Sequence, residues 1–305
     1  MKFVRKCRFE IEKCVEYDFN LSAAAYSFSW NFDGKFLRIR LDIDDKFVVV
    51  RCYEDGNKII VDVYGRYEDS INRDLVIEKV VYSLGISEDL SKFYELCRGD
   101  PILKDVLIGL HMRSVDPWYA TIIAVSQQNA SFRQGWSMIY KLHVNYGSRI
   151  YLEDDKVFIT IPDPKYIVER GESILRDCGY GYRSSIVVNI AKRFLEYGDY
   201  NLYKILKDVK GVGPYTYGLS LVLAYRDYSK PVIDRWVRGL YNFVGIKDVD
   251  NYFRNYWRDY QGLVTWFLTV MLDAEPLSRA LERIRKGVLR PVMKGLTPLT
   301  MWRYL

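Results

Sequence analysis

A glycine-rich turn followed by an aspartate is the part of the chain whose residue types and spacing could do chemistry. The turn reads Gly211-Val-Gly213-Pro214, and Asp234 follows after the apolar residues Val232 and Ile233. Gly211 and Gly213 allow a tight turn with positive φ, and Pro214 suits the first position of a helix. The free N–H groups at such a helix start bind anions, and a glycine lets a phosphate approach the backbone closely. The turn is also typical of an ordinary connection between helices, and Asp234 of a helix N-cap.

Positive charge accompanies this turn and the end of the chain. Lys207 and Lys210 directly precede the glycines, and the net charge of the whole chain is +6. After Pro276 the one acid is Glu282, whereas the basic residues are Arg279, Arg283, Arg285, Lys286, Arg290, Lys294 and Arg303. This distribution fits either a solvated helix face or an edge that follows the phosphates of a nucleic acid.

Several ordered segments together resemble the helix-hairpin-helix superfamily of DNA glycosylases. They are the hairpin with its later aspartate, the segment Ser114–Asn129, which is similar to the opening helix of the glycosylase domain, and the Gly-Tyr-Arg segment at Gly181-Tyr182-Arg183. The N-terminal part is similar to that of the 8-oxoguanine and 3-methyladenine II branches. The resemblance spans about residues 20 to 272 and implies a base-excision enzyme acting on duplex DNA.

The resemblance assigns the chemistry to Asp234. Cleavage of an N-glycosidic bond builds positive charge on the sugar, as in glycoside hydrolysis. A buried carboxylate beside that carbon stabilises the charge and can orient or deprotonate a water molecule. We therefore expect Asp234 to be the catalytic carboxylate.

The residue after Pro214 separates two branches of the superfamily. Members that also cut the backbone carry a lysine two residues after the second glycine, and this chain has Tyr215 there. A phenol cannot form an imine, whereas an aromatic face attracts a cationic alkylated purine. Tyr260 falls where the 3-methyladenine branch has another pocket aromatic. Both tyrosines are therefore expected in a base pocket, with core packing as the alternative.

Four further positions match DNA-contacting residues of the superfamily. Gln128 falls where a side chain fills the gap left by the flipped base, with an exposed helix-end amide as the alternative. Arg133 matches a position that can reach the opposite base. Tyr182 and Arg183 match positions that press on the kinked duplex. The predicted DNA contacts are thus these four residues together with the hairpin.

The elements that must position these residues indicate an α+β fold. Apolar and polar residues alternate over 26–32, 37–43, 47–53 and 59–63, with turns at Asp33-Gly34 and Asp55-Gly56, which predicts an antiparallel sheet with one solvated face. Helices Asp74–Leu84 and Ser87–Cys97 are expected to cover it. After residue 100 the apolar spacing becomes helical, interrupted by an extended piece at 157–162. The predicted helices there are Pro117–Gln128, Phe132–Tyr146, Lys165–Cys178, Arg183–Tyr197, Tyr200–Val209, Pro214–Tyr225, Arg235–Val244 and Val249–Thr269. We thus expect a sheet domain over 1–100 and an all-α glycosylase domain over 101–305.

The remaining composition bears on which cofactors the protein could bind and on its cellular location. The five cysteines are widely spaced and there are two histidines, so neither a zinc site nor an iron–sulfur cluster is expected. No cofactor is predicted apart from a monovalent or divalent cation that could join the hairpin to a DNA phosphate. No apolar run is long enough for a membrane span, and no secretory signal is seen, which favours a cytoplasmic location (in a prokaryote, nucleoid-associated). The protein is expected to be a monomer.

The sequence prediction of function is a monofunctional glycosylase that hydrolytically removes an alkylated purine from duplex DNA. One alternative is an 8-oxoguanine or deaminated-purine glycosylase, with lyase activity from a lysine such as Lys210 or Lys230. The other is a protein that binds DNA lesions without cutting them.

Overall fold

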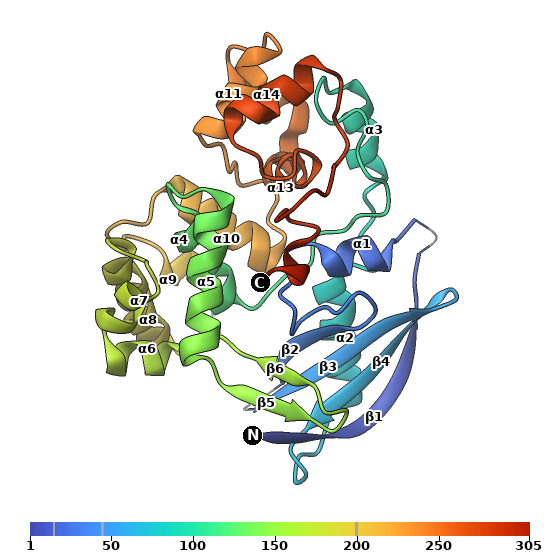
Figure 1. Cartoon of the computed structure of the whole chain (residues 1–305), viewed down its shortest axis with the longest axis vertical. Coiled ribbons are helices and arrows are strands. Elements are labelled where there is room, and N and C mark those ends of the chain that lie inside the picture. The colour runs from blue at the N-terminus through green and yellow to red at the C-terminus, as the bar shows by residue number, and fades with distance from the viewer. Residues whose placement is uncertain (15, 44–45, 199–200) are drawn as a thin grey trace.

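The computed structural model describes residues 1–14, 16–43, 46–198 and 201–305. A six-stranded sheet forms one end of the molecule, and helices form the rest (Figure 1). The strands are β1 (Lys2–Glu12), β2 (Leu37–Ile43), β3 (Lys46–Asp55), β4 (Lys58–Gly65), β5 (Arg149–Leu152) and β6 (Val157–Ile159), in the spatial order β2-β3-β4-β1-β5-β6.

The N-terminal sheet is confirmed, with two corrections. β2, β3 and β4 pair antiparallel as predicted, and Gly56 takes the left-handed φ of 59° in the turn between β3 and β4. The predicted strand 26–32 is wrong, because this segment forms turns and pairs with β2 only through the bridge between Phe32 and Leu37. The segment is instead a folded loop, in which Phe28, Trp30 and Phe32 are buried. β1, which the sequence analysis missed, supplies the additional central strand.

The sheet also takes strands from the second half of the chain. β5 pairs parallel with β1 through Lys2–Tyr151 and Phe3–Leu152, and β6 pairs antiparallel with β5. The predictions of a purely antiparallel sheet and of an all-α second half are therefore wrong. The extended piece predicted at 157–162 contributes β6.

The helices fall into two groups, those of the first hundred residues and those of the rest of the chain. α1 (Phe19–Ala24), α2 (Arg73–Leu84) and α3 (Ser91–Gly99) belong to the first hundred residues. The prediction that two helices after the strands cover the sheet is confirmed for α2 and wrong for α3, which packs in the larger core against Trp257. The later helices are α4 (Pro117–Gln127), α5 (Phe132–Tyr146), α6 (Pro164–Arg170), α7 (Glu172–Asp177), α8 (Arg183–Tyr197), α9 (Leu202–Ile205), α10 (Pro214–Tyr225), α11 (Arg235–Phe243), α12 (Val249–Tyr252), α13 (Gln261–Met271) and α14 (Leu277–Arg285). Short turns of π-helix (Phe253–Trp257) and 3-10 helix (Arg258–Tyr260 and Met301–Arg303) complete the set.

Three predicted helices are broken or shortened by backbone conformation. Gly171, with φ of 70°, divides 165–178 into α6 and α7, and Arg258, with φ of 48°, ends the helical path between α12 and α13. The helix predicted from Tyr200 begins outside the described residues, and its described part is the single turn α9. None of the helices in the described ranges has the length and apolarity needed to cross a membrane.

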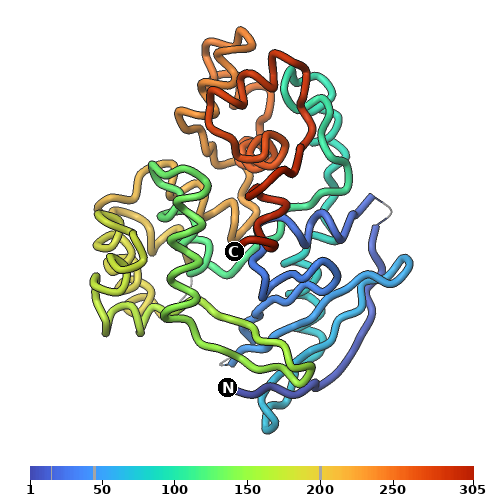
Figure 2. Tube along the Cα trace, in the orientation of Figure 1, coloured from blue at the N-terminus to red at the C-terminus, as the bar shows by residue number. Residues whose placement is uncertain are grey.

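One large hydrophobic core joins the two halves of the chain. It includes Phe3 and Phe28 from the first hundred residues, Trp118 and Ile190 from the middle, and Met301 from the C-terminal segment. A second, smaller core lies between the sheet and the helices α1 and α2. The segment after α14 returns to α1, so that the C-terminus lies near the loop that follows α1 (Figure 2), and the N–H of Ser29 donates to the carbonyl of Leu305 at 2.9 Å.

Candidate active site

Asp234 lies at the start of α11, where it serves as the N-cap. Its carboxylate accepts a hydrogen bond from the N–H of Val237 at 2.8 Å. Burial raises the pKa of Asp234, while the N–H groups of Val237 and Trp236 and the charge of Arg238 act against that rise. The approach to Asp234 is fixed because Thr265 donates to the carbonyl of Val232 at 3.1 Å. The result is a carboxylate held at a defined place in a poorly solvated environment.

Tyr215 lies next to Asp234, in the first turn of α10. Burial, and secondarily the charge of Asp234, raise the pKa of the Tyr215 phenol, so the phenol is neutral at physiological pH. Both residues line a cavity of about 1290 Å³ that runs between the helical half and the sheet. The structure thus brings together the two residues that the sequence placed in the catalytic site and the base pocket.

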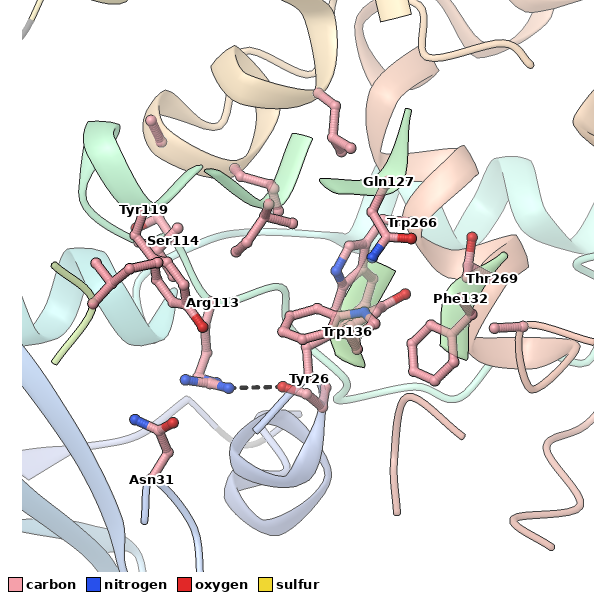
Figure 3. Close-up of a pocket in the computed structure, with 18 of the residues that line it drawn as sticks. Tyr26, Asn31, Arg113, Ser114, Tyr119, Gln127, Phe132, Trp136, Trp266 and Thr269 are labelled. Atoms are coloured by element: carbon pink, nitrogen blue, oxygen red, sulfur yellow. Dashed lines mark hydrogen bonds between the residues drawn. The ribbon is translucent and has the colours of Figure 1, made fainter. Parts of the chain in front are cut away.

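Four aromatic rings form a cage that is part of the same cavity (Figure 3). The ring of Tyr26 lies 5.5 Å from Trp136, 5.6 Å from Trp266 and 6.2 Å from Phe132, measured between ring centroids. The four rings come from the loop after α1, from α5 and from α13, which are far apart in the sequence. We call Tyr26, Phe132, Trp136 and Trp266 the aromatic cage.

Tyr26 is held in the cage by the C-terminal segment. Its φ is 55°, and its N–H donates to the carbonyl of Pro298 at 2.7 Å. Burial raises the pKa of the Tyr26 phenol, with Tyr215 adding to the rise and a hydrogen bond with Thr269 opposing it. The sequence analysis assigned Tyr26 to a strand, so no local signal pointed to this role.

A carboxamide faces the cage from α4. Gln127 lines the cavity, and its Nε2 is buried without a hydrogen-bond partner in the described part of the chain. Its side chain lies over Gly135, where an added Cβ would come within 2.3 Å of Nε2. The cage therefore has one neutral polar group, in addition to the hydroxyls of Thr265 and Thr269, that could hydrogen-bond a ligand.

Tyr260 does not line this cavity. It lies in the 3-10 turn before α13, and its ring packs against Phe93 of α3, with centroids 5.6 Å apart. Trp266, which lies six residues later in the chain, provides the aromatic surface that was expected from Tyr260. We therefore place Trp266, not Tyr260, in the candidate base pocket.

The two hairpin glycines have different roles in the fold. Gly211 has φ of +95°, and a Cβ there would come within 2.6 Å of Ile186 on α8, so both backbone conformation and packing require glycine. Gly213 has φ of −96° and ψ of 179°, and nothing lies within 4 Å of where its Cβ would be. The prediction of positive φ is confirmed for Gly211 and wrong for Gly213. The space at Gly213 is open to a ligand.

The start of α10 presents unpaired donors beside this space. Among the described residues, no backbone carbonyl accepts from the N–H groups of Gly213 and Tyr215, and Pro214 has none to donate. Lys207 and Lys210 are exposed on the preceding turn. This geometry suits an anion, as the sequence predicted.

The predicted DNA-contacting residues gather around the C-terminal end of α4. Gln128 Nε2 donates to the carbonyl of Gly211 at 3.1 Å, which ties α4 to the hairpin. Arg183 donates to the Gln128 carbonyl at 2.9 Å through Nε and at 2.5 Å through Nη2, and its guanidinium lies 4.6 Å from the ring of Tyr182. Arg183 therefore holds the loop after α4. Tyr182 is 54% exposed, and its hydroxyl donates to the Gln128 carbonyl at 3.5 Å. Arg133 is exposed at the rim of the cavity.

No group of three His, Cys, Asp or Glu side chains is arranged to hold a metal ion in the ranges that the structure describes. Lys79 and Lys294 line the cavity, whereas Lys210 and Lys230 do not. Lys230 instead pairs with Asp227 at 3.4 Å. The two lysines considered for lyase chemistry thus lie outside the site.

Solved structures share the fold over most of the chain. The 3-methyladenine DNA-glycosylase from Archaeoglobus fulgidus matches with a TM-score of 0.68 and 20% identity, covering 85% of this chain and 96% of that one. The 8-oxoguanine glycosylase/lyase from Clostridium acetobutylicum matches with a TM-score of 0.63 and 14% identity in its apo form, covering 88% and 98%. Its complex with double-stranded DNA containing cytosine opposite 8-oxoG matches with the same score and identity, covering 93% and 99%. The chain has the fold of these DNA glycosylases. No protein-family model and no curated protein sequence matches it.

Proposed function

We propose that this protein is a DNA glycosylase that flips a damaged purine out of duplex DNA and hydrolyses its N-glycosidic bond. The observation that carries the proposal is a half-buried carboxylate, Asp234, in the same cavity as an uncharged aromatic cage, in a fold shared with known DNA glycosylases. In this reaction Asp234 stabilises the positive charge that develops on the sugar and orients the attacking water. The free N–H groups at the start of α10 hold a DNA phosphate.

The cage favours an alkylated purine as the substrate. Aromatic faces attract an electron-poor, cationic ring, and stacking on them is worth about 1–3 kcal/mol per base. The four cage side chains themselves carry no charge, so the surface on which the purine stacks is neutral. Tyr215 adds a neutral aromatic ring beside Asp234 rather than an amine.

One assay tests the reaction and its substrate class. Duplexes that each contain a single N-alkylated purine, 8-oxoguanine, hypoxanthine or uracil are incubated with the protein, and released bases are identified by mass spectrometry. We expect release of the alkylated purine with both strands intact. The absence of release from every duplex, together with tight binding to one of them, would instead favour a lesion-binding protein.

A trapping assay tests the hydrolytic mechanism. Because Tyr215 cannot form an imine, borohydride should capture no covalent complex with DNA, and abasic product should persist until alkali is added. Lys294→Ala and Lys79→Ala are the informative variants if a complex does form, since these two lysines line the cavity. Efficient trapping that one of them abolishes would show a lyase and move the assignment to the oxidised-purine alternative.

A further inference from the structure

A half-buried arginine, Arg113, lies in the same cavity on the opposite side of Tyr26 from Phe132 (Figure 3). Arg113 donates from Nε to the carbonyl of Ser22 at 3.0 Å. Its Nη2 donates to the carbonyl of Ala25 and to the hydroxyl of Ser27, each at 2.7 Å. These partners are all neutral, and no carboxylate of the described residues forms an ion pair with Arg113. Burial accordingly lowers the pKa of Arg113 to about 10.

Two hydrogen-bond donors at this place have no partner within the described residues. They are Nη1 of Arg113 and the hydroxyl of Tyr119, a residue in the first turn of α4, and both side chains line the cavity. The charge of Arg113 acts on the Tyr119 phenol, lowering its pKa against the larger rise caused by burial. In Figure 3 the Tyr119 hydroxyl points toward Arg113, with the amide of Asn31 below them.

Two acids of the cavity, Asp116 and Asp42, face another cation rather than this arginine. Asp116 and Asp42 line the cavity toward β2, and Asp42 adds to the burial that raises the pKa of Asp116 to about 6, whereas Arg40 lowers it. Arg40 is the cation that faces them, and it donates to Asp42 at 2.8 Å. Arg113 is thus a half-buried cation with neutral partners only, and its free N–H group and the Tyr119 hydroxyl face the cavity, where an oxyanion can pair with them.

We propose that Arg113 and Tyr119 bind a small oxyanion, a phosphate or a carboxylate group, inside the cavity. The planar guanidinium suits oxyanions, and the phenol supplies a second, neutral donor. The site does not depend on the proposed glycosylase activity. It is nevertheless next to the cage, because Arg113 holds the carbonyl of Ala25, which immediately precedes Tyr26. An oxyanion on Nη1 would therefore bind beside the segment that positions this cage ring.

Titration of the full-length protein with inorganic phosphate and with acetate, at constant ionic strength, tests the site. Binding is followed by NMR of the arginine side-chain N–H signals, with the Arg113 signal identified from Arg113→Gln. We expect one of the two anions to shift this signal with saturation, and the stronger of them distinguishes a phosphate from a carboxylate ligand. Arg113→Gln should abolish saturable binding.

Tyr119→Phe is the decisive variant, because the Tyr119 hydroxyl bonds nothing in the described chain and its loss should leave the fold intact. It should weaken anion binding about tenfold. Gly213→Ala, which alters the anion site of the hairpin instead, should leave the Arg113 response unchanged. Wild-type affinity in Tyr119→Phe, or no saturable shift with either anion, would overturn the proposal and leave Arg113 as a clamp on the end of α1.

Discussion

Asp234 serves two functions whose requirements conflict. As an N-cap it stabilises α11, but as a buried carboxylate it has a raised pKa, so its ionised form is less stable in the folded protein than in the unfolded chain. Its contribution to stability is therefore largest at low pH and is lost as the pH rises through the raised pKa. Ionised Asp234 thus lowers stability at neutral pH, in exchange for the charge that the proposed reaction needs.

Replacement of Asp234 by Asn should separate these two functions. Asn still accepts from the N–H of Val237 and carries no charge, so the melting temperature at pH 7 should be equal to or higher than that of the wild type. Base release should fall by about 10²–10³-fold, the usual effect of removing an electrostatic stabiliser, while DNA affinity remains. Calorimetry, single-turnover kinetics and a binding assay measure the three quantities. Near-normal turnover would remove Asp234 from the active site.

The pH dependence of the reaction should follow the same carboxylate. As the pH falls through the raised pKa of Asp234, the carboxylate is protonated and kcat/KM should drop, so the acid limb should lie above the ordinary aspartate value of 3.8. Arg238 lowers this pKa, so Arg238→Ala should move the acid limb to higher pH. Asp250→Asn is the matched control, because it breaks the ion pair of Arg238 but keeps the arginine charge. An acid limb that stays in place in Arg238→Ala would show that another group controls it.

Two interpretations of the hairpin between α9 and α10, a phosphate-binding site and a purely structural turn, can be distinguished by mutation. Gly213→Ala should fold normally, because its φ suits any residue and its Cβ would meet no atom. We expect it to weaken binding to damaged and undamaged duplex alike by about tenfold, the effect of losing one good charge-assisted contact, since the Cβ keeps the phosphate from the backbone. The measurement is a salt-dependent binding titration with both duplexes.

Gly211→Ala is the contrasting variant at the same turn. Its positive φ and the 2.6 Å approach to Ile186 should cost about 1–3 kcal/mol of stability, so weaker binding there would report on folding. A normal melting temperature with unchanged DNA affinity in Gly213→Ala would show that the hairpin is merely structural.

At the scale of elements, helices and turns could be predicted from the sequence, whereas contacts between distant segments could not. Spacings of a few residues predict the ranges of α4, α5 and α8 and the turn at Gly211. The approach of Tyr215 to Asp234 is implied by the resemblance to the glycosylase superfamily rather than by spacing. The cage could not be predicted, because Tyr26, Trp136 and Trp266 meet only after three distant segments pack together. Alternation over 26–32 suggested a strand, yet the N–H of Tyr26 bonds Pro298 near the other end of the chain. Tyr260 and Trp266 lie six residues apart, and of these two residues Trp266 alone lines the cavity.

At the scale of the whole molecule, the site depends on both halves of the chain. The predicted division at residue 100 crosses the larger core and cuts the pairing of β1 with β5. It also separates Arg113 from its partners near α1, and Tyr26 from Pro298. The cage therefore needs residues from before and after that boundary.

We accordingly expect residues 101–305 not to fold alone. This fragment would expose the β5–β6 hairpin and the core surface that Phe3 and Phe28 cover, and Arg113 would lose the carbonyls it holds. Without these contacts it should show helical far-UV circular dichroism but little near-UV signal and no cooperative melting. The full chain should lose both signals in a single transition, because one core connects its parts. Mixing fragment 1–100 with the larger fragment should restore near-UV signal only if the halves dock. A cooperative melting transition of 101–305 on its own would show that the helical half is an independent domain and that the N-terminal sheet merely adds Tyr26 to a site already formed.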